Sequence, residues 1–229
     1  MQIFNYGLNI QPGKYPYKDS CFKKLVDKFS PGKLSPYTVE FIDQNPERAE
    51  AVVFDETKRL DLIVADLEKI ENRVTRAESE EEKKFLQSCQ QALEKEVLLC
   101  DLEVPQAQQG FLKQLPLLSS KPSLGKTDTP EINSLIGEVI AKCGMLLFFT
   151  AGKKEVRAWS LKKGLNILEA AGKIHSDLKR GFIKGEVVNC DQLDNFFNLA
   201  EARSRGLVKV VDRDYIISAN DIIEIRFSV

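Results

Sequence analysis

Hydrophobic and polar residues alternate most regularly in the last third of the chain. Alternation with a period of two predicts strands over five segments, namely residues 146–150, 155–160, 182–189, 208–211 and 222–227. Apolar residues three and four positions apart predict helices over 167–178 and 191–203. Strands mixed with helices in this order predict an α+β layer, with helices covering one face of a sheet.

The middle of the chain changes to a helical pattern. Between residues 57 and 77, apolar residues recur at steps of three and four, with charged residues at most other positions. Ser79, with Glu82 three residues later, predicts the start of a second helix, whose apolar residues run from Phe85 to Val97. A helix that binds a membrane surface would need a basic polar face and bulky aromatic residues. The mixed charges and aliphatic stripes favour instead an antiparallel helical hairpin, in which the two stripes bury each other.

The patterns in the first 56 residues are shorter. Residues 1–8, 37–43 and 51–54 are rich in β-branched and aromatic residues and predict strands. Residues 19–29 have helical spacing, and Ser30-Pro31-Gly32 predicts the end of that helix. A small α/β segment is therefore expected at the N-terminus.

Two connections complete the predicted elements. A short helix is expected to begin at Val104-Pro105. Residues 123–129 are rich in turn-forming residues and predict a linker without a strand, and a helix follows over about 132–140. A helix is thus expected on each side of this linker.

Composition limits the class of protein. The chain has 229 residues, of which 43% are hydrophobic and 29% are charged, and its net charge is −1. This near-zero charge argues against a surface made for nucleic acid as a whole, although a local basic face is still compatible with it. Residues at the N-terminus do not form a signal-peptide pattern, and no run of about 18 apolar residues occurs, so membrane insertion is not expected.

The five cysteines are odd in number and far apart, and none belongs to a Cys-x-x-Cys pair. This spacing encodes neither a disulfide framework nor a zinc site. We therefore expect all five thiols to be free and reduced, in a cytoplasmic protein.

Gly7, Gly13 and Lys14 are candidates for a vestigial phosphate-binding loop. A working loop needs four residues between its first glycine and the Gly-Lys pair, followed by Ser or Thr for magnesium. Here five residues intervene and Tyr15 follows the lysine, while Pro12 removes one backbone donor. A plain turn between a strand and a loop is the favoured interpretation.

His175 is the single histidine, so any histidine-based catalysis would have to use it. No serine or cysteine beside it has the context of a nucleophile, and Ser176-Asp177 favours local backbone hydrogen bonding at a helix end. We therefore expect no catalytic residue, no metal site and no cofactor.

Basic residues gather between positions 153 and 184. One interpretation is a solvated face, and the other is a patch that meets RNA phosphates, with Trp159 as a stacking surface. Alternation does not decide whether Trp159 faces the core or solvent. The candidate residues for binding a partner or RNA are Arg157, Trp159, His175, Lys179 and Arg180.

Residues 148–188 resemble, nearly letter for letter, the C-terminal TGS domain of the YchF-type GTPases of the Obg-related group. That domain is a small ubiquitin-like β-grasp module. The matching short segments are Thr150-Ala151-Gly152, Val156-Arg157-Ala158-Trp159, Ala170-Ala171-Gly172, Ile174-His175-Ser176-Asp177 and Arg180-Gly181-Phe182-Ile183.

The resemblance weakens towards the N-terminus. The words Ala65-Asp66-Leu67-Glu68 and the segment 117–122 resemble the entry to and exit from the family's helical coiled-coil domain. Asp43 stands where the family has its γ-phosphate sensor, but the sensor's glycine is missing, and the Asn-x-x-Glu motif that selects the base is absent after Pro122. The resemblance therefore implies a truncated, degenerate G domain.

The resemblance and the patterns together divide the chain into four segments. These are a vestigial G-domain remnant (1–56), a helical hairpin domain (57–122), a linker with a connecting helix (123–143) and a TGS-like β-grasp domain (144–229). The expected fold class is α+β, with a C-terminal β-grasp domain, a central antiparallel helical hairpin and a small α/β remnant at the N-terminus.

The family binds and hydrolyses purine nucleotides and is associated with ribosomes. Because the nucleotide motifs are incomplete here, the first hypothesis is a non-enzymatic binding or regulatory protein that docks on a protein or a ribosome/RNA partner, without membrane binding or DNA sequence readout. The alternative is residual ATP or GTP binding, or weak NTPase activity, through Gly7, Gly13 and Lys14. A third possibility is a regulatory partner that pairs with a full-length relative and blocks it.

Overall fold

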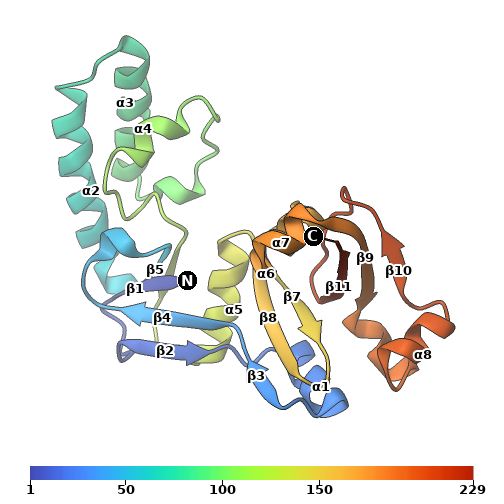
Figure 1. Ribbon diagram of the computed structural model, residues 1–229. Coiled ribbons are helices and arrows are strands. Elements are labelled where there is room, and N and C mark those ends of the chain that lie inside the picture. The colour runs from blue at the N-terminus through green and yellow to red at the C-terminus, as the bar shows by residue number, and fades with distance from the viewer. Residues whose placement is uncertain (229) are drawn as a thin grey trace. The chain divides into compact units, whose positions relative to one another are not determined.

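The computed structural model describes residues 1–228, and these residues form two compact units. The first unit comprises residues 1–15 and 39–142, and the second comprises residues 16–38 and 143–228. This division differs from the four segments expected from sequence, since residues 16–38 belong with the C-terminal sheet. The α+β class is confirmed, because both units combine helices with a sheet (Figure 1).

The first unit contains a five-stranded sheet with the strand order β2-β4-β1-β5-β6. Its strands are β1 Gln2–Tyr6, β2 Gly13–Pro16, β4 Thr38–Ile42, β5 Ala51–Asp55 and β6 Ser123–Lys126. β1 runs parallel to β4 and β5, and β5 runs parallel to β6. Ile3, at the centre, is in register with Phe41 on one side and Ala51 on the other, and all three are buried.

β6 corrects the sequence prediction of a linker without a strand at residues 123–129. Its sequence, Ser-Leu-Gly-Lys, has no β-branched or aromatic residue. The strand forms because β5 offers an unpaired edge, and Val53 is in register with Leu124 on it. Gly125 fits there because the Glu56 side chain occupies the space that a Cβ atom would need. Tertiary pairing here overrides local propensity.

Two long helices of the first unit pack against each other, α2 Arg59–Val74 and α3 Glu80–Glu94. The Ser79 side chain accepts a hydrogen bond from the backbone N–H of Glu82, and the Glu82 carboxylate accepts one from the backbone N–H of Glu78. These bonds satisfy N–H groups at the start of α3 and confirm the predicted capping position. The buried side of the pair includes Ile63, Ile70, Phe85, Leu86 and Leu93.

The rest of the first unit includes the 3₁₀ turns η1 Pro46–Arg48, η2 Glu56–Lys58 and η3 Leu99–Asp101, and the helices α4 Gln109–Lys113 and α5 Ile132–Lys142. Asp66 of α2 is fully buried and fixes the segment before β6. Its carboxylate accepts hydrogen bonds from the backbone N–H groups of Leu118 and Ser119, at 3.2 and 2.7 Å, and from the Ser119 hydroxyl. This carboxylate therefore ties α2 to the chain that leads into β6.

The second unit contains a six-stranded sheet with the order β10-β9-β11-β7-β8-β3. Its strands are β3 Lys33–Ser35, β7 Met145–Ala151, β8 Glu155–Lys162, β9 Phe182–Asn189, β10 Lys209–Val211 and β11 Asp221–Phe227. The five strands predicted in this region are confirmed. β7 and β8 pair antiparallel, β11 pairs parallel with β7, and β3 adds a parallel edge strand beside β8.

Helices cover both faces of this sheet, whereas the sequence predicted cover on one face. On one face, α6 Ile167–Ile174 buries Ile167 and Ala171 beside Phe148. On the other face, α1 Ser20–Phe29 buries Phe22 and Leu25. The predicted helix over 167–178 is interrupted at His175, after which α7 Ser176–Arg180 begins. The predicted helix over 191–203 is the 3₁₀ turn η4 Cys190–Asn195 followed by α8 Leu199–Ser204.

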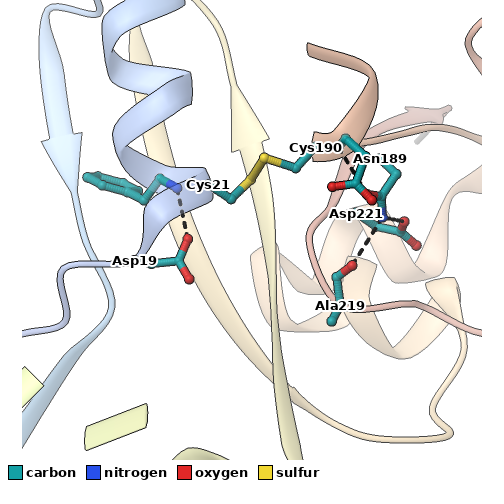
Figure 2. The surroundings of a disulfide bond; sticks show 8 residues. Asp19, Cys21, Asn189, Cys190, Ala219 and Asp221 are labelled. Atoms are coloured by element: carbon teal, nitrogen blue, oxygen red, sulfur yellow. Dashed lines mark hydrogen bonds between the residues drawn. A yellow bond between two sulfur atoms is a disulfide. The ribbon is translucent and has the colours of Figure 1, made fainter. Parts of the chain in front are cut away.

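A disulfide bond joins Cys21 of α1 to Cys190 of η4 (Figure 2). The prediction that all five cysteines are free and reduced is therefore wrong. The two residues are 169 positions apart in sequence, but α1 packs on the sheet so that their Cα atoms are 6.0 Å apart. This distance lies within the normal range for a disulfide. Cys89, Cys100 and Cys143 are not disulfide-bonded.

Hydrogen bonds fix the backbone on both sides of the bridge (Figure 2). Asp19 caps α1 by accepting from the backbone N–H of Phe22 at 2.8 Å. Asn189 donates to the carbonyl oxygen of Ala219 and to the carboxylate of Asp221, both at 3.1 Å. Among residues 1–228, no helix is both long and apolar enough to cross a bilayer.

Candidate functional site

A basic groove lies along the β3 edge of the second unit's sheet. Its volume is about 500 Å³, a size typical of ligand sites. One wall is the segment from Lys33 to Thr38, and the floor is β8 from Arg157 to Ser160. Lys173 of α6 also lines the groove. The lining contains three cationic residues, and no carboxylate lines it among the residues that the structure describes.

Trp159 forms the aromatic centre of the groove. It is half-buried, so it belongs partly to the core and partly to the surface. Its indole N–H donates to the Thr150 hydroxyl at 3.1 Å, and its ring stacks beside that of Phe148 on the paired strand. The Arg157 guanidinium carbon lies 3.9 Å from the centre of the indole ring. This is a cation–π contact, which holds the guanidinium on the indole.

Glu155 sets the charge at one end of the groove. Its carboxylate pairs with Lys33 at 3.1 Å and accepts a hydrogen bond from the Ser35 hydroxyl at 2.6 Å. The bonds from Ser35 and Lys33 hold the pKa of Glu155 below its ordinary value, so it stays ionised at neutral pH. Arg157 and Lys173, by contrast, form no ion pair within residues 1–228. The groove therefore keeps uncompensated positive charge.

A second hollow of about 370 Å³ adjoins the groove at Lys173. Lys173 lines both cavities, and Lys179 lines the second one. Lys179 is paired with Glu169 at 2.7 Å, so its charge is compensated. Of the five predicted partner-binding residues, the structure brings Arg157 and Trp159 together and places Lys179 one cavity further along.

His175 and Arg180 line neither cavity. His175 is the N-cap of α7, where its Nδ1 accepts a hydrogen bond from the backbone N–H of Asp177 at 3.1 Å. Arg180 pairs with Asp177 at 3.0 Å. Both side chains are exposed and take part in local contacts of α7, and their role in binding stays a prediction.

Gly7, Gly13 and Lys14 lie at the two ends of the loop that follows β1. Gly7 has a φ of +91°, which favours glycine. Asn5 closes the loop, since its side-chain amide donates to the carbonyls of Leu8 and Ile10 and accepts from the N–H of Leu8. Some backbone groups that a phosphate cradle would use are therefore engaged within the protein. Lys14 lies in β2 rather than at the start of a helix.

The sequence missed one wall of the groove. This wall includes Lys33, Ser35 and Thr38, which the sequence patterns place in the N-terminal remnant. The pairing of β3 with β8 brings them to the groove. No local signal identifies such a short strand, and Leu34 is an exposed apolar residue within it. Residues 1–228 contain no cluster of three or more His, Cys, Asp or Glu side chains that could hold a metal ion.

Residues 145–228 match the family YchF-GTPase_C, which is described as a protein of unknown function (DUF933). The match covers β7 to β11 of the second unit, and it does not include the wall of the groove formed by residues 33–38.

Several curated proteins are similar to the chain. It is 30% identical to the ribosome-binding ATPase YchF of Bacillus subtilis, over 76% of this chain and 66% of that protein. It is 42% identical to the YchF protein of Mycoplasma genitalium, over 46% of this chain and 29% of that protein. It is also 42% identical to Obg-like ATPase 1 of Xenopus laevis, over 35% of this chain and 20% of that protein. The chain therefore spans about two thirds of the Bacillus protein and less than one third of the other two.

Among solved structures, the YchF GTPase of Schizosaccharomyces pombe has a similar fold. The TM-score is 0.77 at 15% sequence identity, over 95% of this chain and 88% of that chain. The prediction that the chain is not an enzyme is contradicted by these comparisons, because the relatives are named ATPases. The incomplete nucleotide-binding motifs were therefore not sufficient evidence for the absence of enzymatic activity.

Proposed function

Since the chain belongs to the YchF-type family of GTPases, we propose that it is a ribosome-binding protein and that its basic groove meets ribosomal RNA. The observation that carries this proposal is the groove lined by Lys33, Arg157 and Lys173 without a lining carboxylate. Relatives named ribosome-binding ATPases support the choice of partner. A ribosomal partner also places the protein in the cytoplasm.

The chemistry of the groove fits a phosphate-rich partner. The net charge of the whole chain is −1, so attraction to RNA must come from a local concentration of cations. Arg157 and Lys173 are not neutralised by ion pairs within residues 1–228, and guanidinium and ammonium groups are the side chains that contact phosphate oxygens most. We include in the proposal that the chain from residue 144 onward is a TGS-like β-grasp domain, that residues 1–56 are a remnant of the family's G domain and that residues 57–122 are its helical domain.

Ribosome binding by the full chain should depend strongly on salt. Two or three phosphate contacts predict a loss of affinity of about 7- to 40-fold between 50 and 200 mM monovalent salt, because bound counterions are released. Sedimentation of the purified chain with ribosomes at several salt concentrations measures this slope. Retention that does not change with salt, or an absence of retention at 50 mM salt, would contradict the proposal.

A purine-nucleotide site is the second candidate function, and the parallel strands of the first unit favour it. Ligands of open α/β sheets bind outside the carboxyl ends of the strands. Gly7 follows β1 at that edge, and a Cβ atom on it would come within 3.2 Å of the Lys58 side chain, which follows β5. Lys14 lies in β2, at the other end of the same loop. Lys14 and Lys58 are the cations that would meet the phosphates.

Isothermal titration with ATP and GTP in the presence of Mg²⁺ tests this candidate. We expect saturable binding that weakens by at least about fivefold in Lys14→Ala or Lys58→Ala, since each change removes one charged contact to a phosphate. Lys113→Ala, in α4, is the control and should bind as the wild type does. Phosphate release in the same samples measures turnover. Heats that show no saturation up to millimolar nucleotide would remove this candidate and leave the ribosome proposal in place.

A further inference from the structure

The stacked pair of Arg157 and Trp159 lies inside the basic groove. Trp159 is held by its hydrogen bond to Thr150 and by Phe148, so its ring cannot turn without losing both contacts. The guanidinium of Arg157 is held on this ring at 3.9 Å. A planar cation that lies over a hydrogen-bonded aromatic ring offers a flat surface to a second planar group.

Nucleobases are the planar groups that RNA offers to such a surface. Sequence-tolerant RNA recognition uses stacking of unpaired bases on aromatic rings and on the planes of arginine side chains. Bases inside a duplex present only their edges, because both of their faces are covered by neighbouring bases. The stacked pair therefore favours single-stranded RNA over a helix.

Two further cations line the same groove, and they come from different elements. Lys33 belongs to β3 and Lys173 belongs to α6. Glu155 compensates Lys33 at one end, whereas Lys173 has no ion pair within residues 1–228. Phosphates before and after a stacked base can thus each meet one ammonium group.

We propose that the groove binds an unpaired base of single-stranded RNA, which stacks on the Arg157 guanidinium while its flanking phosphates contact Lys33 and Lys173. This proposal rests on the proposed ribosome function and names the kind of RNA that the groove takes. A protein partner fits the groove less well, because three cations line it, one of them the guanidinium over Trp159, and no large apolar patch does.

Trp159 is the one tryptophan of the chain, so its fluorescence reports directly on the groove. The test titrates the full chain with an unstructured RNA decamer, and with heparin as a polyanion that has no bases. We expect RNA to quench the emission in a saturable way and heparin to quench it far less. Equal quenching by both, or no change with RNA, would overturn the stacking proposal.

Substitutions distinguish the contribution of base stacking to RNA affinity from the contribution of positive charge. Arg157→Lys keeps the charge and removes the plane, so we expect RNA affinity to fall by at least about fivefold, the lower bound for losing one stacked base. Trp159→Leu, followed by fluorescence anisotropy of labelled RNA, should lose a similar factor. Lys163→Ala removes an exposed charge that does not line the groove and should bind RNA within about twofold of the wild type. An Arg157→Lys protein that binds RNA as the wild type does would overturn the proposal.

Ribosome sedimentation with the same proteins distinguishes the proposal of base stacking from the proposal of ribosome binding. If ribosomes are retained with the expected salt dependence while free RNA causes no quenching, the stacking proposal fails and ribosome binding stands. If neither ribosomes nor RNA bind, both proposals fail.

Discussion

Removing the Cys21–Cys190 bridge lowers the free energy of unfolding of the second unit by about 2–5 kcal/mol. The bridge closes a loop between residues 169 positions apart, and such long loops gain the most from a cross-link in the chain-entropy account. It also holds α1 on the sheet face that buries Phe149 and Val156. Urea unfolding followed by the fluorescence of Trp159, which lies in this unit, measures the effect with and without reductant.

The matched control is Cys21→Ser, in which reductant should cause no further loss of stability. Thiol counting gives an independent check. Under denaturing conditions without reductant, we expect three reactive thiols, those of Cys89, Cys100 and Cys143, and five after reduction. Five reactive thiols before reduction would show that the bridge does not form.

Asp66→Ala should destabilise the first unit by about 3–5 kcal/mol, because it leaves buried donors without their acceptor. The carboxylate is fully buried and accepts from two backbone N–H groups and from the Ser119 hydroxyl, and Lys69 lies 3.1 Å away. Urea unfolding followed by the helical circular dichroism signal measures the loss, since α2 and α3 lie in this unit.

Asp61→Ala is the control for this change. Asp61 lies on the same helix, but it is exposed and pairs only with the exposed Lys58. Exposed ion pairs contribute about 0–1 kcal/mol, so we expect a small effect on the free energy of unfolding. A loss of less than about 1 kcal/mol in Asp66→Ala would contradict the anchoring role of this residue.

Much of the second unit could be predicted from sequence, because its strands are apolar or alternating runs such as β8. Val156 and Ala158 are buried on one face of β8, while Trp159 packs on the other. The alternation was therefore correct, but it could not tell which face α1 covers. The helix predicted over 167–178 was interrupted because His175 has extended backbone and caps the next helix.

The parts that the sequence did not predict depend on contacts between distant residues. β3 and β6 have weak strand propensity, and each exists because it pairs with the edge of a neighbouring strand. Cys21 and Cys190 become neighbours only after α1 packs on the sheet. The groove has the same origin, since Lys33 and Arg157 come from segments that no local pattern connects.

The incomplete nucleotide-binding motifs led to a wrong prediction about enzymatic activity. The loop after β1 departs from the phosphate-binding pattern, and this departure suggested a protein without enzymatic activity. The relatives are named ATPases, so a missing pattern in the loop does not decide the class. Titration with nucleotide and variants at Lys14 and Lys58 addresses the first unit directly.

The central claim is that the basic groove is the surface that binds the ribosome. The most direct measurement compares ribosome sedimentation of the double variant Arg157→Glu/Lys173→Glu with that of Lys163→Glu/Lys209→Glu. Both change the net charge equally, but the second pair does not line the groove. We predict an affinity loss of about tenfold or more for the groove variant and a much smaller loss for the control. Equal binding by the two variants would contradict the claim.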